Sequence, residues 1–263
     1  MTRVVMVSAG MRYAVMSSAV VSVFATRLRR IACGSISVAV ALTAMTTATP
    51  GEAAGTPQVL IEAYGDSTTL GITCRNGGCG PQSDNAVTFL QDELRSAYGD
   101  RVSVTNLGIG GTMATQLRDG TGKRGGLSWS ERLAASHAQI VTINYGINEV
   151  MQNLTPEQFY EAETELVKTA RAQGKLPVLE TSNPMPDGRR NARLAEMAAM
   201  TRRVAAEQRV PLVDQFAYIL TLPAWQTMMS DGAHPKPELY RLKAQQDFRV
   251  LDPLVKRLLD GTS

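Results

Sequence analysis

The sequence has few histidines, few cysteines and no apolar run near its N-terminus long enough to span a membrane. Its 263 residues include two histidines and three cysteines. Two histidines leave only His137 and His234 as candidates for an imidazole base. The apolar runs at 13–25 and 31–44 are both shorter than the roughly 20 residues that cross a bilayer. A membrane-spanning helix is therefore disfavoured.

The first 53 residues have the pattern of a secretory signal peptide. Arginines at 27–30 precede the second apolar run, and small residues follow it up to Ala54. A basic cluster, a short apolar run and a small-residue cleavage site are the parts of such a peptide. We expect residues 1–53 to be removed and residues 54–263 to form an exported domain, periplasmic or extracellular, without a stable membrane span. An uncleaved anchor is the alternative, which the arginines within the apolar stretch disfavour.

Without this leader the chain has no excess of positive charge. The full chain carries a formal net charge of +3, whereas residues 1–53 hold five arginines and one acid, or +4. The remaining domain is therefore close to −1. Proteins that bind nucleic acid present a basic face to the phosphates. We expect no nucleic-acid partner.

Two of the three cysteines lie close together in a glycine-rich segment. Cys33 falls in the leader, whereas four residues separate Cys74 from Cys79. In an exported protein such a pair predicts a local disulfide. A metal site is the alternative, but two cysteines without a nearby histidine make a poor zinc site. We expect no bound metal, and little global stabilisation from so short a closed loop.

Short apolar runs alternate with helical patterns along the rest of the chain. Strands are predicted at 59–64, 102–107, 138–145, 176–181 and 210–213. Helices are predicted at 86–98, 155–173, 191–208 and 237–259, the first capped by Asp84, the second by Thr155 and the last broken or kinked near Pro253. Such alternation forms βαβ units. The predicted class is α/β, a three-layer α/β/α sandwich with a mostly parallel sheet of about five strands.

Small polar residues and glycines follow the first three strands. Ser67 follows the first strand, Gly111 lies in the turn after the second, and Asn148 follows the third. Asp231 and His234 come later, just before the last helix. In parallel α/β sheets the loops at the carboxyl ends of the strands usually bind the ligand. These residues are therefore the candidates for a functional site.

A serine becomes a strong nucleophile only when a neighbouring base takes its proton. His137 has no acid within the four residues after it, and we interpret it as a surface residue. His234 follows Asp231 by three residues in a turn of Gly, Ala and Pro. The carboxylate can hold Nδ1–H and leave Nε2 for Ser67, which are the roles of a catalytic triad. An ordinary capped turn is the alternative for Asp231 and His234.

These blocks resemble those of the SGNH, or GDSL-like, hydrolase superfamily of esterases and lipases. The serine, glycine, asparagine and histidine that name the family correspond here to Ser67, Gly111, Asn148 and His234, with Asp231 before the histidine. The resemblance covers about residues 58–240 and implies the flavodoxin-like SGNH fold. Two positions depart from the family pattern, because Glu149 stands where aspartate is usual and Thr69 stands near the usual leucine.

The resemblance also implies an oxyanion hole. Its donors would be the backbone N–H groups of Ser67 and Gly111 and the side-chain amide of Asn148. The glycines at 108–111 can also be interpreted as a tight turn. A dinucleotide-binding loop is a further interpretation, which the absence of the full GxGxxG pattern disfavours. Asp66 and Glu149 are expected to be structural.

The predicted reaction is hydrolysis of a carboxylic ester through an acyl-enzyme, without a cofactor. Aromatic residues make up 5% of the chain, and the resemblance implies an open cleft. Both favour short acyl chains, such as O-acetyl groups on carbohydrates or other small esters. The alternatives are a lysophospholipase- or thioesterase-type lipid hydrolase and a non-catalytic exported binding module. The segment 120–126, with Trp129, is expected to form a polar loop that lines the cleft or faces solvent.

Overall fold

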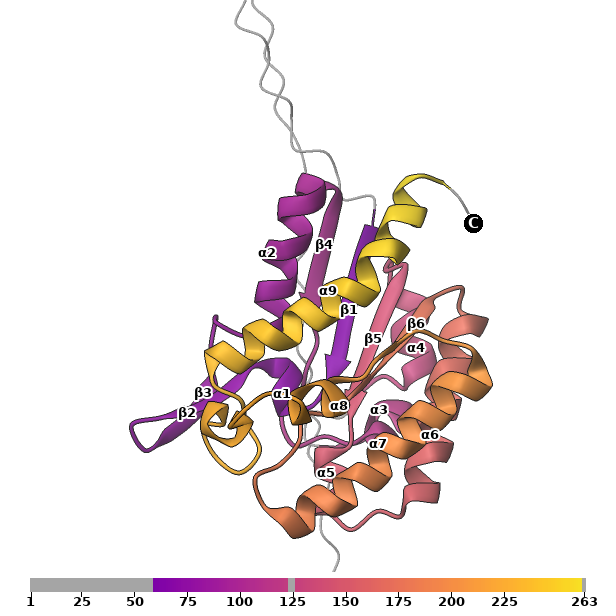
Figure 1. Cartoon of the computed structure of the whole chain (residues 1–263). Coiled ribbons are helices and arrows are strands. Elements are labelled where there is room, and N and C mark those ends of the chain that lie inside the picture. The colour runs from indigo at the N-terminus through magenta and orange to yellow at the C-terminus, as the bar shows by residue number, and fades with distance from the viewer. Residues whose placement is uncertain (1–58, 123–125, 262–263) are drawn as a thin grey trace, which may run out of the picture. The chain divides into compact units, whose positions relative to one another are not determined.

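A parallel five-stranded sheet is the centre of the fold (Figure 1). The computed structural model describes residues 59–122 and 126–261, so the predicted signal peptide and residues Lys123 and Arg124 lie outside the described residues. The strands are β1 (Val59–Gly65), β4 (Val102–Asn106), β5 (Ile140–Tyr145), β6 (Leu176–Thr181) and β7 (Leu212–Val213). Their order is β4-β1-β5-β6-β7, and all neighbours are parallel. The predicted fold class is confirmed.

Helices cover both faces of the sheet. On one face, α2 (Ala86–Tyr98) packs against α9 (Pro237–Leu259), which crosses the sheet in Figure 1. The other face is covered by α3 (Ala114–Asp119), α4 (Trp129–Ala135), α6 (Pro156–Ala172) and α7 (Gly188–Gln208). The shorter elements are α1 (Ser67–Leu70), α5 (Ile147–Met151), α8 (Gln215–Leu220) and the 3-10 turns η1 (Gly99–Arg101) and η2 (Trp225–Met228).

Side chains of the central strands alternate between two apolar cores. Every residue of β5 is buried. Val141 and Ile143 belong to the core under α6 and α7, whereas Ile140 belongs to the core under α2 and α9. Full burial of one such side chain contributes about 1.5–3 kcal/mol. The sequence predicted this strand from its β-branched residues, which are enriched in strands.

Trp129 lies in the core and does not line a polar loop, so that expectation was wrong. It begins α4 and is 1% exposed. Its indole N–H donates to the main-chain oxygen of Leu166 at 2.9 Å, and its ring packs edge-on against Tyr64. An indole can be buried in this way because its one polar group has found a partner.

The helix boundaries follow local capping chemistry. The predicted box at the start of α6 is present, with Thr155 and Gln158 each accepting from the other's backbone N–H. The cap of α2 is Asn85, whose side chain accepts from the N–H of Thr88, and not the predicted Asp84. The Asp84 carboxylate instead pairs with Arg75 at 2.7 Å. Adjacent polar residues of similar cap propensity cannot be ranked from sequence alone.

The last helix continues through its proline. The predicted break near Pro253 was wrong, because α9 runs unbroken from Pro237 to Leu259. A kink there stays a prediction. Pro253 is exposed, whereas Leu251, Leu254 and Val255 around it are buried. Packing of these apolar neighbours offsets the backbone hydrogen bond that proline cannot donate.

A small hairpin between α1 and α2 was missed by the sequence prediction. It consists of β2 (Ile72–Arg75) and β3 (Gly78–Pro81), which pair antiparallel with Cys74 opposite Cys79. The two cysteines form a disulfide, as the sequence predicted. The hairpin escaped prediction because four-residue strands rich in glycine have little of the alternating apolar pattern that marks a strand.

The sheet order brings three loops to one edge. β1 lies between β4 and β5, so the chain moves to one side of β1 and then to the other. Loops at the carboxyl ends of strands on either side of such a reversal form the usual ligand crevice of open α/β sheets.

Among the described residues, none of the helices is both long enough and apolar enough to cross a membrane.

Candidate active site

Ser67 is the first residue of α1 and directly follows the buried strand β1. The Asp66 carboxylate caps this helix, accepting from the backbone N–H of Thr68 at 2.8 Å and from its hydroxyl at 3.0 Å. The strand must end in glycine, because a Cβ on Gly65 would lie 2.6 Å from the main-chain oxygen of Asn144. The tight strand-to-helix turn leaves Ser67 half-buried at the carboxyl edge of the sheet.

Asp231 and His234 lie in the loop between η2 and α9. Oδ1 of Asp231 accepts from the backbone N–H groups of Ala233 at 2.8 Å and His234 at 2.6 Å, which closes the turn. Oδ2 of Asp231 lies 2.8 Å from Nδ1 of His234, and Nε2 of His234 lies 2.9 Å from Oγ of Ser67. The fold thus brings the three predicted side chains into one line of hydrogen bonds.

The Asp231 carboxyl is held in its ionised form. Burial acts to raise its pKa, but the backbone N–H groups of His234 and Ala233 and the His234 side chain outweigh burial, so the pKa is lowered. The side chains of Asp231 and His234 are 34% and 19% exposed. A carboxylate facing Nδ1 favours the proton on that nitrogen, which leaves Nε2 able to accept one.

His137 lies elsewhere. It is exposed and follows the end of α4, just before β5 begins. Residues that precede a strand lie at the amino edge of the parallel sheet, whereas Ser67 lies at the carboxyl edge. The interpretation of His137 as a surface residue agrees with this position.

The glycine turn after β4 passes close to Ser67. A Cβ on Gly108 would lie 2.4 Å from the backbone nitrogen of Leu70, and a Cβ on Gly110 would lie 3.7 Å from Cβ of Ser67. Gly111 has φ +78°, a conformation that favours glycine. The segment is therefore a tight turn, and its main chain lies beside the serine.

Asn148 lies on α5, half-buried beside both of these segments. Its Nδ2 donates to the main-chain oxygen of Thr112 at 2.9 Å and to Oδ2 of Asp66 at 3.2 Å. Asp66 is fully buried and has no role as the acid partner of His234 here, because Asp231 occupies that position. The structural role expected for Asp66 is that of a helix cap and a support for Asn148.

Glu149 joins the turn after β4 to the turn after β5. Its side chain is fully buried, and its two oxygens accept from the backbone N–H groups of Ala114 at 2.7 Å and Gly146 at 2.8 Å. Burial is the main cause that raises the pKa of Glu149 to about 7, and the charge of Asp66 acts in the same direction. The residue that departs from the family pattern therefore links the segments that carry Gly111 and Asn148.

A buried charged group beneath α1 was not predicted. Lys243 and Asp247 on α9 are 2% and 4% exposed, and they line one small cavity with Glu180 and Asn144. Burial lowers the pKa of Lys243 and raises that of Asp247. The available signal was the i, i+4 spacing of Lys243 and Asp247, which places both on the face of α9 that also carries the buried Tyr240.

Three possible metal ligands also meet near the site. Within the described ranges, Cys74, Cys79 and Asp231 are the group whose ligand atoms lie close enough to hold an ion. The two sulfurs are joined in a disulfide and offer no thiolate. This donor set does not fit a metal in the oxidised protein.

A parallel α/β sheet with a serine, an imidazole and a carboxylate in hydrogen-bonded series at its carboxyl edge is an arrangement found in serine hydrolases. The chain belongs to the GDSL-like lipase/acylhydrolase family, whose model matches residues 63–242. Family membership makes it a carboxylic ester hydrolase. Comparison with curated protein sequences gave no significant match.

Solved structures share the fold at low sequence identity. A lipase/acylhydrolase from Enterococcus faecalis is 20% identical with a TM-score of 0.61, covering 74% of this chain and 96% of that one. TesA is 22% identical with a TM-score of 0.60, covering 74% and 99%. A catalytic mutant of an acetylxylan esterase from Geobacillus stearothermophilus is 19% identical with a TM-score of 0.61, covering 74% and 94%.

Proposed function

We propose that the protein is a serine esterase in which Ser67 is the nucleophile, His234 the general base and Asp231 the acid that orients it. The observation that carries this proposal is the series of two hydrogen-bond distances, 2.8 Å from Asp231 to His234 and 2.9 Å from His234 to Ser67. Nε2 takes the hydroxyl proton as Oγ attacks the ester carbonyl. The imidazolium then protonates the leaving alcohol, and an acyl-enzyme remains. Water, activated by the same imidazole, releases the acid and restores Ser67.

The negative charge of the tetrahedral intermediate needs hydrogen-bond donors. We propose the backbone N–H groups of Ser67 and Gly111 and the amide of Asn148. The close approach of the 108–111 turn to Ser67 supports the main-chain donors. The Asn148 amide donates to Thr112 and Asp66 in this structure, so it must exchange one of these bonds for a bond to the oxyanion. Loss of one such donor typically costs about 10²–10³ in turnover.

The substrate we propose is an ester of a short acyl chain, such as an O-acetyl group on a carbohydrate or a small ester. The low aromatic content supports this choice, and one of the structural neighbours is an acetylxylan esterase. A series of p-nitrophenyl esters from acetate to decanoate tests it. We expect kcat/KM to fall with chain length, whereas a maximum at long chains would favour the lipid-hydrolase alternative. Acetate release from acetylated polysaccharides then tests the carbohydrate class.

The variant Ser67→Ala tests the nucleophile. We expect hydrolysis of p-nitrophenyl acetate to fall by about 10³-fold or more, because the acyl-enzyme can no longer form. The matched control is Ser83→Ala, an exposed serine on the loop before α2, which should keep full activity. Labelling by a fluorophosphonate should be lost in Ser67→Ala and kept in Ser83→Ala. Full residual turnover in Ser67→Ala would contradict the proposal and favour a binding module.

We also propose that residues 1–53 are a signal peptide and that the enzyme acts outside the cytoplasm. The sequence pattern of the leader supports this, as does the disulfide, because disulfides persist in oxidising compartments. N-terminal sequencing of the protein recovered from the exported fraction should place the new terminus near Ala54. Recovery of the uncleaved chain in membranes would favour the anchor instead.

A further inference from the structure

The disulfide hairpin lies directly against the loop that carries Asp231 and His234. The backbone N–H of Cys74 donates to the Ser230 hydroxyl at 3.0 Å, and that hydroxyl donates to the main-chain oxygen of His234 at 2.9 Å. The buried hydroxyl of Thr73 donates to the main-chain oxygen of Pro235 at 3.1 Å. β2 and this loop are thus connected before and after the acid–base pair.

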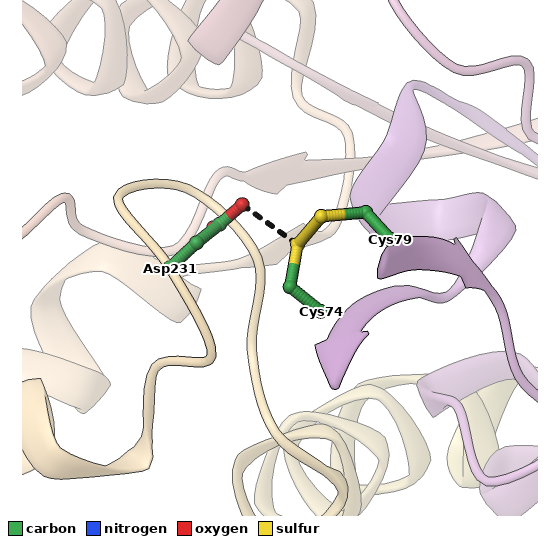
Figure 2. Close-up of side chains that lie close together, drawn as sticks. All are labelled: Cys74, Cys79 and Asp231. Carbon is green, nitrogen blue, oxygen red and sulfur yellow. Dashed lines mark hydrogen bonds between the residues drawn. A yellow bond between two sulfur atoms is a disulfide. The ribbon is translucent and has the colours of Figure 1, made fainter. Parts of the chain in front are cut away.

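The disulfide itself contacts the carboxylate. Figure 2 shows the Asp231 side chain directed at the bridge, with Cys74 as the nearer cysteine, and Sγ of Cys74 lies 3.0 Å from Oδ2 of Asp231. A disulfide sulfur carries no hydrogen, so it donates nothing to this oxygen. The same Oδ2 lies 2.8 Å from Nδ1 of His234, within hydrogen-bond distance. The oxygen that faces the imidazole is therefore covered on another side by a neutral sulfur.

A neutral sulfur at this position has two physical effects. It occupies space that water would otherwise fill beside a carboxylate that is 34% exposed, and the attraction between a carboxylate and an imidazolium is stronger where water is excluded. It also leaves the hydrogen bond to His234 Nδ1 without a competing donor from the hairpin. Both effects favour the orientation in which Nε2 faces Ser67.

We propose that the Cys74–Cys79 disulfide is a positioning element for Asp231, so that its reduction lowers the turnover of the enzyme. The inference rests on the proposed function, in which Asp231 orients the base His234. Reduction requires a dithiol, whose two thiols supply two electrons and two protons. The S–S bond breaks, Cys74 and Cys79 each gain a hydrogen, and the reductant becomes a disulfide.

Reduction reverses the second effect. The thiol of Cys74 becomes a hydrogen-bond donor beside Oδ2 and competes with Nδ1–H of His234 for it. The hairpin also loses its covalent closure. It is still held by the bonds from the Thr73 hydroxyl and the Cys74 backbone, and by the bond from the Tyr240 hydroxyl to the main-chain oxygen of Ile72 at 2.7 Å. The expected result is a weaker acid–base contact in a protein that stays folded.

The first experiment compares the oxidised and the dithiothreitol-reduced full chain. We expect kcat for p-nitrophenyl acetate to fall about tenfold on reduction, as for a weakened charged hydrogen bond, with KM little changed. The variant Cys33→Ser should respond to the reductant as the wild type does. Unchanged kcat after complete reduction, verified by thiol titration, would overturn the proposal, and so would a change confined to KM.

Two variants separate the sulfur contact from general damage to the hairpin. Cys79→Ser keeps a thiol at Cys74 beside Asp231 and should show the low kcat of the reduced enzyme without added reductant. Arg75→Gln removes an exposed ion pair with Asp84 on the same hairpin and should keep both full kcat and the response to reductant. Equal losses in both variants would indicate a merely structural hairpin and contradict the proposal.

A spectroscopic readout distinguishes failure of this inference from failure of the proposed function. The downfield proton NMR signal of the hydrogen-bonded Nδ1–H in His234 can be assigned by its loss in the variant His234→Gln. Reduction should move this signal upfield. If Ser67→Ala retains esterase activity, the proposed function fails, whereas an unmoved His234 signal overturns the positioning role alone.

Discussion

At the scale of single residues, Asp231 carries the sharpest prediction because its two oxygens have separate partners. Oδ1 holds the turn through Ala233 and His234, whereas Oδ2 faces the imidazole. In Asp231→Asn the carbonyl oxygen can still hold the turn, but the amide places a donor toward Nδ1 and stabilises the wrong tautomer. We expect kcat to fall by about 10²–10⁴, with KM and thermal stability nearly unchanged.

The control for this variant is Asp187→Asn. Asp187 is an exposed cap of α7 that accepts from the N–H of Arg190 at 2.8 Å. Asparagine is an equally good cap, so activity and stability should both be kept. If Asp231→Asn retained full kcat, the carboxylate charge would have no part in the reaction.

At the scale of elements, the proposed oxyanion donors depend on a connection between two turns. Glu149 accepts from Ala114 in one segment and from Gly146 in the other. In Glu149→Gln one of these N–H groups would face an amide NH₂ and lose its acceptor. We expect kcat to fall about tenfold or more, with a small effect on KM, because the donors shift relative to the transition state.

The conservative variant Glu149→Asp provides the comparison. It keeps the carboxylate but is one methylene shorter, so it can accept from the N–H of one turn but not easily from the N–H groups of both. Its kcat should lie between those of the wild type and Glu149→Gln. A kcat for Glu149→Gln equal to that of the wild type would show that the link between the turns does not set the donor geometry.

The last helix carries a second prediction at this scale. Pro253 is exposed inside α9 and cannot donate to the carbonyl one turn earlier. Pro253→Ala restores that donor and removes the steric conflict, although it also frees the unfolded chain. We expect a net gain of about 1–2 kcal/mol in the free energy of unfolding, measured in urea. A loss of stability would mean that the helix depends on its proline.

At the scale of the whole molecule, buried carboxyl groups should make the free energy of unfolding fall as the pH rises. The pKa of Glu149 is raised from 4.5 to about 7, and burial raises that of Glu163 in the same direction. The stability that protonated Glu149 contributes is complete below about pH 4.5 and is lost as the pH rises through about 7. The shift of Glu149 corresponds to about 3 kcal/mol.

Urea unfolding at several pH values tests this expectation. The free energy of unfolding should fall between about pH 4.5 and pH 7, and that of Glu149→Gln should fall less steeply because its amide does not titrate. If the free energy of unfolding changed equally with pH in the wild type and in Glu149→Gln, burial of Glu149 would not be the cause of the change.

Much of the molecule could be predicted because its signals are local. The segment 140–145 is rich in β-branched residues, which marks it as a strand, and Thr155 with Gln158 marks the start of α6 through contacts three residues apart. Trp129 was misjudged for the converse reason. Its burial depends on Leu166 and Tyr64, which lie far away in the sequence.

The sequence by itself determined the chain order of the five strands of the main sheet and of the four long helices, the candidate acid and base three residues apart, and the pairing of two neighbouring cysteines. Each depends on interactions within a few positions along the chain. Only the tertiary structure decided that His234 lies 2.9 Å from Ser67 across 167 positions, and that the disulfide covers the carboxylate of Asp231. Those distances follow from how the sheet and its helices pack, which no local pattern encodes.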